Sequence, residues 1–131
     1  MATKKILCIG GAGQLGRIVV KSLLPYEVTN IDFNSCDAAK VNINLDLVST
    51  PIQNNHHAIS ELKDINNTFD SILVTAGRWA GGTIADEDYI AKCLQMIDIN
   101  LNSCLLGAHL ATNYLKKDGL VVFTGAAVVF H

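Results

Sequence analysis

The residues of this chain best suited to chemistry are a group of glycines that could hold a phosphate. The stretch GGAGQLG, residues 10–16, follows an apolar run and opens a helical pattern. It contains Gly-x-Gly-x-x-Gly at Gly11, Gly13 and Gly16, and Gly10 adds an overlapping Gly-x-x-Gly-x-x-Gly. Glycines let a pyrophosphate approach the backbone without meeting a Cβ atom, and a helix N-terminus offers free N–H groups. Between a strand and a helix, the motif favours dinucleotide binding over a purely structural turn.

Gln14 and Leu15 complete this predicted cofactor loop. Asp32 ends the next apolar run, VTNIDF, where a carboxylate can accept both ribose hydroxyls of an adenosine and repel a 2′-phosphate. No arginine follows in FNSC, residues 33–36, to receive such a phosphate. The sequence therefore predicts NADH as the cofactor, with NADPH possible but weaker. Two alternatives stay open: Asp32 as a turn residue at a strand end, and Arg17 as a phosphate contact instead of a solvated helix residue.

Alternating apolar runs and helical patterns must position these residues. The runs are rich in Ile, Val and Leu, as is typical of parallel strands covered on both faces. We therefore predict one α/β domain over residues 1–131, a Rossmann-type parallel sheet with helices on both faces. The link before the third strand is short for a parallel crossover. The expected strands are Lys5–Ile9, Glu27–Phe33, Val41–Leu45, Ser71–Val74 and Leu120–Thr124, and the expected helices are Gln14–Leu24, Ile52–Ile65 and Asp86–Lys117.

The last of these helices carries the clearest periodic pattern. Small and apolar residues recur at spacings of three and four, which predicts that they form its core face. The sequence KKDG, residues 116–119, would then supply cations to the helix C-terminus and a glycine to end it. The predicted core face consists of Cys93, Ile97, Leu101, Cys104, Ala108 and Ala111.

Composition excludes several classes of function. The formal net charge is −2, and no run of Lys and Arg exceeds two residues, which argues against nucleic acid or an anionic membrane as a partner. The first apolar run, residues 6–9, is too short for a signal peptide or a membrane span, so we expect a cytoplasmic protein. The 4 cysteines form no Cys-x-x-Cys pair and are expected to be reduced thiols, and no metal site is predicted.

Several segments together resemble one known family. GGAGQLG with Asp32, ILVTAGRWAGG (residues 72–82), HLATNYLKKDGL (109–120) and VVFTGAA (121–127) are similar to the dihydropteridine reductases, atypical members of the short-chain dehydrogenase/reductase family. The resemblance covers nearly the whole chain. Its most specific part is GRWAGG, because ordinary short-chain dehydrogenases carry Asn-Asn-Ala-Gly at this point and no tryptophan after it. Only Ala76 and Gly77 remain of that motif.

The resemblance gives expected roles to the residues around this loop. Ala76 and Gly77 end a strand at the carboxyl edge of the sheet, where their small size would admit the cofactor. Trp79 would project beside the nicotinamide, where a planar pterin could stack on it. The alternative is that Trp79 only packs the loop onto the domain or onto a partner subunit.

Two further positions are interpreted through the same family. Asn100, in IDINLN, matches the helix asparagine that holds a water near the catalytic lysine, although a polar residue on a helix face is an equally good interpretation. Ala126 takes the position where typical members place a catalytic serine. Dihydropteridine reductases lack that hydroxyl as well, because their quinonoid substrate needs no carbonyl polarisation. An alignment shifted by a residue or two would bring Thr124 to this place instead.

The chain departs from the family in one respect. Members continue into Tyr-x-x-x-Lys on a long helix, where the tyrosine donates a proton. Here Tyr26, Tyr89 and Tyr114 have no lysine four residues on. We therefore expect this chain to hold the cofactor half and the first wall of a substrate site. Expressed alone, it is expected to self-associate through its last, uncovered strand and to lack reductase activity.

The resemblance implies a function for the complete protein. NADH would reduce a quinonoid dihydropteridine to the tetrahydro form, in an enzyme whose small-molecule substrate is a pterin and which assembles as a homodimer. Two other functions stay open. One is a dinucleotide-binding protein without catalysis, and the other is a short-chain dehydrogenase that acts on a carbonyl.

Overall fold

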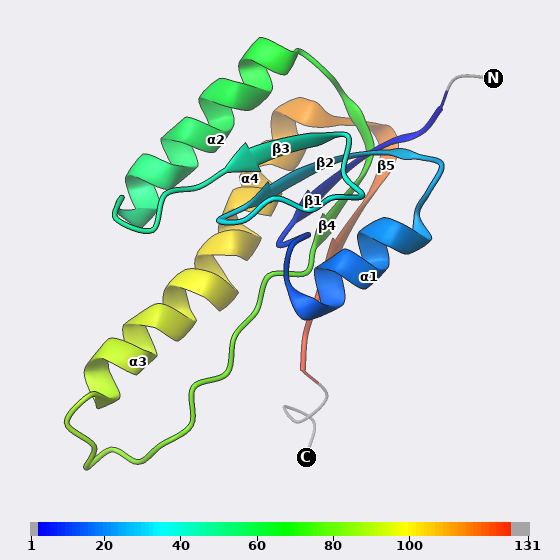
Figure 1. Cartoon of the computed structure of the whole chain (residues 1–131). Coiled ribbons are helices and arrows are strands. Elements are labelled where there is room, and N and C mark those ends of the chain that lie inside the picture. The colour runs from blue at the N-terminus through cyan, green and yellow to red at the C-terminus, as the bar shows by residue number, and fades with distance from the viewer. Residues whose placement is uncertain (1–2, 127–131) are drawn as a thin grey trace.

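The computed structural model describes residues 3–126 and confirms the predicted Rossmann-type α/β architecture. The described strands form one parallel sheet in the order β3-β2-β1-β4-β5 (Figure 1). The elements in chain order are β1 (Lys5–Ile9), α1 (Gln14–Ser22), β2 (Glu27–Asp32), β3 (Val41–Asn44), α2 (Pro51–Ile65), β4 (Phe69–Val74), α3 (Tyr89–Met96), the π-helical segment η1 (Ile97–Asn102), α4 (Ser103–Tyr114) and β5 (Leu115–Phe123).

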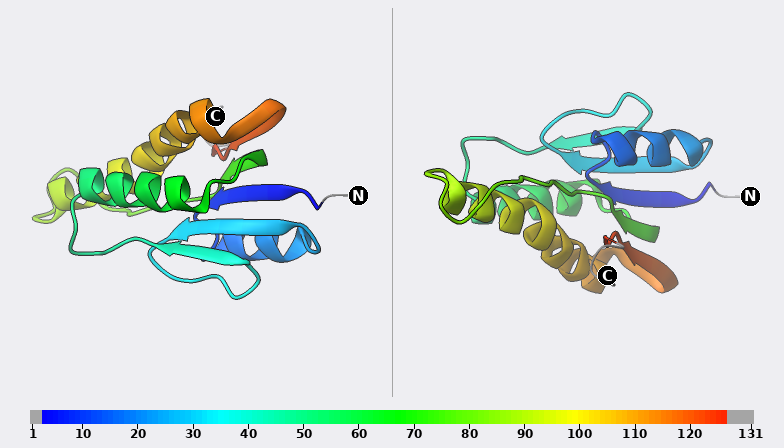
Figure 2. Two further views of the ribbon diagram at one scale, coloured as in Figure 1. Left: turned by 90° about the horizontal axis from the view of Figure 1, so that it is seen from above. Right: turned by 90° about the horizontal axis from the view of Figure 1, so that it is seen from below.

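Different helices cover the two faces of the sheet. Strand β1 shows how the sequence achieves this, because successive side chains of a strand point to opposite faces. Leu7 packs into a cluster with residues of α2 and α4, whereas Ile6 and Cys8 pack against Val20 of α1. Figure 2 shows α1 and α2 on opposite sides of the sheet. The layered arrangement leaves the carboxyl ends of the strands free to form a site.

Asparagine side chains hold the short crossover between β2 and β3 in place of a helix. Asn42 accepts the Cys36 N–H at 2.8 Å and donates to the Cys36 carbonyl at 3.2 Å. Asn30, which is fully buried, donates to Asn42 Oδ1 at 3.0 Å and to the Asn34 carbonyl at 3.3 Å. These amides form hydrogen bonds with backbone groups of the loop, which in a longer crossover would be paired within a helix. The third strand can therefore follow β2 after a short link.

The helix predicted over Asp86–Lys117 is wrong in its bounds, and its predicted core face is right only at Cys104 and Ala111, which are half-buried against the core. Helix α3 begins at Tyr89, α4 ends at Tyr114, and the π-helical segment η1 lies between them. A π-turn holds more residues than an α-turn, so it rotates the residues that follow onto a different face. Aliphatic residues occur on both sides of this helix, so periodicity alone could not choose the buried side. The buried face of α4 consists of Ser103, Leu106, Gly107 and Leu110, whereas Ile97, Leu101 and Ala108 of the predicted face are exposed.

The helix also does not end at the predicted KKDG sequence, residues 116–119. Leu115 is already extended and pairs with Phe69, so β5 begins before the two lysines. The left-handed residue is Asp118, with a φ of 64°, and not the glycine that follows it. Lys116 bonds Asp70 at 3.3 Å instead of capping the helix. The backbone N–H of Lys5, together with Lys116, lowers the pKa of the Asp70 carboxyl.

Strand β5 lies at one edge of the described sheet and is poorly covered. Val122 pairs in register with Leu73, on the face that α1 covers further along the sheet. Leu120 is 59% exposed and Val122 is 41% exposed. This agrees with the expectation of an open, apolar last strand.

Candidate functional site

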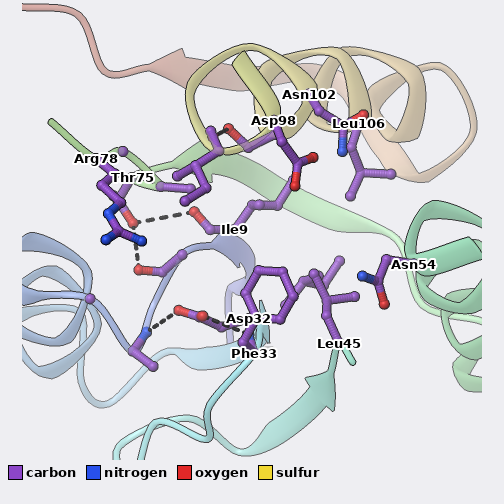
Figure 3. Close-up of a pocket in the computed structure, with 18 of the residues that line it drawn as sticks. Ile9, Asp32, Phe33, Leu45, Asn54, Thr75, Arg78, Asp98, Asn102 and Leu106 are labelled. Atoms are coloured by element: carbon purple, nitrogen blue, oxygen red, sulfur yellow. Dashed lines mark hydrogen bonds between the residues drawn. The ribbon is translucent and has the colours of Figure 1, made fainter. Parts of the chain in front are cut away.

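A hollow of about 630 Å³ opens at the carboxyl ends of β1, β2 and β4 (Figure 3). Ligands of open parallel sheets bind at this edge, where the strand order reverses beside β1. In Figure 3, Phe33 and Leu45 stand on one side of the hollow and Asp98 and Leu106 stand on the other. The hollow brings together most of the residues predicted to bind a cofactor, namely Gly10, Gly13, Gln14, Leu15, Asp32, Ala76 and Gly77.

Three glycines of the loop are required by the packing of the protein itself. Gly10 has a left-handed φ of 94°, and a Cβ there would collide with Ala76. A Cβ at Gly11 would lie 2.5 Å from Asn30 Oδ1, the atom that accepts the Gly11 N–H at 2.8 Å. A Cβ at Gly16 would collide with the backbone of Gly10 and Gly11. Gly11 and Gly16 are therefore required by the packing of the loop itself. Neither of them lines the hollow.

Gly13 differs from the other glycines of the loop. A Cβ added here would find only the Gly10 carbonyl oxygen, at 3.4 Å, within 4 Å. Gly13 lines the hollow and precedes α1, with a φ of −71° that any residue can adopt. It forms no side-chain cap, so the first N–H groups of the helix can bind an anion. A glycine that no protein contact requires fits a loop that receives a pyrophosphate.

Asp32 lies against the glycine loop. Its Oδ2 accepts the Ala12 N–H at 2.9 Å, and its Oδ1 accepts the Phe33 N–H at 2.6 Å. A carboxylate has about four lone-pair positions, so each oxygen can accept a further hydrogen bond. The carboxylate is half-buried and lines the hollow. The arrangement provides acceptors for a diol at the end of β2.

The end of β4 is bound to the same loop. Thr75 and Ala76 both donate their N–H groups to the Ile9 carbonyl, at 2.9 and 3.1 Å. The Thr75 hydroxyl donates to the Gly10 carbonyl at 3.1 Å. These bonds join two strand ends at the floor of the hollow, and they place Ala76 and Gly77 along its wall.

Comparison with known proteins agrees with this geometry. The chain is 32% identical over 135 residues to a dihydropteridine reductase of Dictyostelium discoideum, a match that covers 98% of the chain and 56% of that reductase. A short-chain dehydrogenase family protein of Francisella tularensis subsp. tularensis SCHU S4 is 29% identical, with a TM-score of 0.80 over 98% of the chain and 53% of that structure. These matches confirm the resemblance of the chain to the dihydropteridine reductases and other short-chain dehydrogenase/reductases.

The chain spans about half the length of these short-chain dehydrogenase relatives. A short-chain dehydrogenase of Leptospira borgpetersenii serovar Hardjo-bovis, solved with bound NAD+, shares the fold at 20% identity. Its TM-score is 0.67, over 83% of the chain and 44% of that structure. No family model matches the chain. Among residues 3–126, no helix is both long and apolar enough to cross a membrane.

Asn100, which the resemblance matches to the helix asparagine of short-chain dehydrogenases, lies on η1. Its Oδ1 accepts the Arg78 N–H at 2.7 Å, and its Nδ2 donates to the Arg78 carbonyl at 2.9 Å. Both polar groups of the side chain thus bind the loop that follows β4. Asn100 does not line the hollow itself, although Arg78 does. The geometry makes it a residue that positions this loop, and its predicted contact with a water near a lysine stays a prediction.

Replacement of Asn100 by alanine is expected to loosen the loop after β4. Two exposed hydrogen bonds, each worth about 0.5–1.5 kcal/mol, would be lost. Trypsin cleavage after Arg78 should then be faster by about threefold or more, because the open loop becomes more populated. Asn113→Ala, which removes an exposed asparagine of α4, is the matched control. Equal cleavage rates in both variants and the unmodified chain would show that the hydrogen bonds between Asn100 and Arg78 do not restrain the loop.

Trp79 and Ala126, the predicted substrate contacts, lie outside the hollow. Trp79 is 84% exposed, so it does not pack onto the described part of the domain. Ala126 is also exposed, whereas Thr124 lines the hollow. The Thr124 hydroxyl donates its proton to the Val74 carbonyl at 2.7 Å, so this proton is already in a hydrogen bond. Of Ala126 and Thr124, only Thr124, the residue of the shifted alignment, lines the hollow.

The sequence did not predict the outer wall of the hollow. Asn55 and Asn102 form a reciprocal amide pair between α2 and η1, at 2.9 and 3.2 Å. Asn54 binds both backbone groups of Asp46 and so fixes the loop before α2. The only signal in the sequence for these contacts is that asparagine recurs before and within α2. Other lining residues that the sequence did not single out are Phe33, Leu45, Asp98 and Leu106.

None of the four cysteines, all of which lie within the described residues, lines the hollow. All four are free thiols. Burial raises the pKa of the Cys8 thiol to about 11, so this residue remains protonated near neutral pH and is a poor nucleophile.

Proposed function

We propose that the chain is the cofactor-binding part of an NADH-dependent dihydropteridine reductase. The observation that carries this proposal is the position of the Asp32 carboxylate against the glycine loop at the end of β2. The 32% identity to a dihydropteridine reductase supports the substrate class. When bound, NADH would supply the hydride that converts a quinonoid dihydropteridine to its tetrahydro form.

Each part of the hollow would have one binding role. The open space at Gly13 and the uncapped start of α1 would receive the pyrophosphate. Asp32 would accept the hydroxyls of the adenosine ribose and disfavour a 2′-phosphate, which is why NADH is proposed over NADPH. Ala76 and Gly77 would leave room for the nicotinamide half. The residues present supply what such a cofactor requires, namely an uncapped helix start, a carboxylate and small side chains.

Trp79 would be the platform for the pterin ring. It is the only tryptophan of the chain, and it follows the loop segment that Asn100 fixes. A flat aromatic side chain that is 84% exposed has a free face for stacking. The alternative, that this side chain is buried against another part of the protein, stays a possible outcome of the test.

Trp79→Ala in the complete protein is expected to raise the KM for the pterin by about two- to tenfold, because offset stacking contributes about 0.5–1.5 kcal/mol. The Kd of NADH should change by less than about twofold, since Trp79 does not line the hollow. Trp79→Phe should keep most of the pterin affinity. Unchanged pterin kinetics in Trp79→Ala would assign the side chain to packing against another part of the protein.

The function is tested by steady-state kinetics on the protein that carries this chain together with the Tyr-x-x-x-Lys segment that the family resemblance implies. We expect oxidation of NADH that depends on quinonoid dihydropteridine. Turnover of simple carbonyl substrates without pterin activity would favour a carbonyl reductase instead. NADH binding without turnover of either substrate would favour a dinucleotide-binding protein without catalysis.

A further inference from the structure

Arg78 lines the candidate cofactor site but has no role in the proposed contacts with the pyrophosphate, the ribose or the nicotinamide. It directly follows Gly77, it lines the hollow, and its side chain is exposed. Among the described residues it is the only lysine or arginine that lines this hollow, and it forms no ion pair. In Figure 3, Arg78 lies near Thr75 at the end of β4, away from Phe33 and Leu45. A cation without a partner in the described structure therefore stands at this end of the hollow.

The backbone of Arg78 is held in place although its side chain is exposed. Asn100 accepts the Arg78 N–H at 2.7 Å and donates to the Arg78 carbonyl at 2.9 Å. The side chain therefore begins at a fixed point beside the wall that Ala76 and Gly77 form. A guanidinium keeps its charge at every pH at which proteins fold. The loop thus places a permanent positive charge next to the space proposed for the nicotinamide half.

The two oxidation states of the proposed cofactor differ in charge at this same end. NADH and NAD+ share the adenosine and the pyrophosphate, but the nicotinamide ring is neutral in NADH and positively charged in NAD+. Asp32 does not neutralise Arg78, because its carboxylate accepts the N–H groups of Ala12 and Phe33 and forms no ion pair. A contact with the shared parts would change both affinities alike. Repulsion between the guanidinium and the ring would act on NAD+ alone.

We propose that Arg78 is a specificity-determining residue that makes the site prefer NADH to NAD+. This inference rests on the proposed function, because it requires the nicotinamide to lie along Ala76 and Gly77. The guanidinium repels the ring once the hydride has left it, so NAD+ is bound more weakly and dissociates more readily after each turnover. By the same thermodynamic cycle, bound NADH is a weaker hydride donor than it would be without Arg78.

The test is a set of calorimetric titrations of the chain with NADH and with NAD+, at low and at high salt. Arg78→Gln removes the charge and leaves the backbone groups that bind Asn100. It should lower the ratio of the NAD+ dissociation constant to the NADH dissociation constant by about three- to fivefold. Arg78→Lys should keep most of this ratio. Lys63→Gln, which removes an exposed cation of α2 outside the hollow, should not change it.

The salt dependence separates an effect of charge from an effect of loop structure. The change caused by Arg78→Gln should shrink at high salt, because ions screen the interaction between exposed charges. A change in the packing of the loop would not depend on salt in this way. If Arg78→Lys alters the ratio as much as Arg78→Gln does, or if high salt leaves the change in full, the charge of Arg78 is not its cause and the inference is wrong.

The remaining outcomes separate this inference from the function on which it rests. If neither NADH nor NAD+ binds, the proposed function fails. If NADH binds and Arg78→Gln leaves the ratio unchanged, the proposed function stands and the role of Arg78 is wrong. Equal losses for NADH and NAD+ also leave the ratio unchanged, and they would show that the guanidinium contacts a part that the two forms share.

Discussion

Gly13→Val is expected to lower the affinity for NADH by at least about tenfold while the chain stays folded. The valine side chain would project into the hollow where the pyrophosphate is proposed to bind, and overpacking of this kind costs about 1–3 kcal/mol. The protein itself is expected to tolerate the change, because a Cβ at Gly13 would have only the Gly10 carbonyl oxygen within 4 Å, at 3.4 Å. The extended backbone of Gly13 also suits a β-branched residue.

Gly16→Val is the matched comparison for this experiment. A side chain at Gly16 would collide with the backbone of Gly10 and Gly11, so this variant should lose thermal stability. Calorimetric titration with NADH and thermal unfolding of both variants give the answer. If Gly13→Val binds NADH as tightly as the unmodified chain, the pyrophosphate does not lie at this loop. If Gly13→Val unfolds as Gly16→Val does, the distinction between the two glycines is wrong.

Asp32→Ala is expected to remove most of the preference for NADH. In the unmodified chain, NADH should bind at least about tenfold more tightly than NADPH, because hydrogen bonds to a charged group contribute about 1.5–3 kcal/mol. The variant should bind NADH about tenfold more weakly and NADPH no more weakly than before. The ratio of the two dissociation constants, measured by calorimetry, reports the change.

Asp32 also accepts the Ala12 N–H, so its removal could act through the glycine loop. Asp32→Asn controls for this, because an amide oxygen can still accept that N–H while the negative charge is lost. Asp64→Ala, an exposed aspartate on α2, should leave both dissociation constants unchanged. Equal affinities for NADH and NADPH in the unmodified chain would refute the assigned role of Asp32.

The sheet and the cofactor loop could be predicted because local sequence determines them. Buried strands such as β1 are short apolar runs, and a turn that leads into a helix at Gly10 and Gly16 tolerates no side chain. The glycine motif and Asp32 therefore predict, from the sequence alone, the edge of the sheet at which the candidate site lies. The structure adds that Gly11 and Gly16 serve packing, whereas Gly13 faces the hollow.

The bounds and the buried face of the long helix could not be predicted, because its hydrophobic pattern is ambiguous. Ile90, Leu94, Ile97, Leu101 and Leu105 are all at least half-exposed, although their spacing of three and four is typical of a core face. The π-helical segment changes the phase, and no residue type marks it. The contacts of Asn100 with Arg78, and of Asn55 with Asn102, join segments far apart in the sequence, which periodicity does not address.

The most direct test of the account is an NMR titration of the isotopically labelled chain with NADH, in which each backbone amide reports on its own surroundings. We expect the largest changes at residues 10–17, at Asp32 and Phe33, and at residues 75–78, and smaller changes at Leu45 and Leu106. The same titration with NADPH should need higher concentrations for the same changes. Changes confined to other surfaces, or no changes at NADH concentrations that saturate its relatives, would contradict the proposed cofactor site.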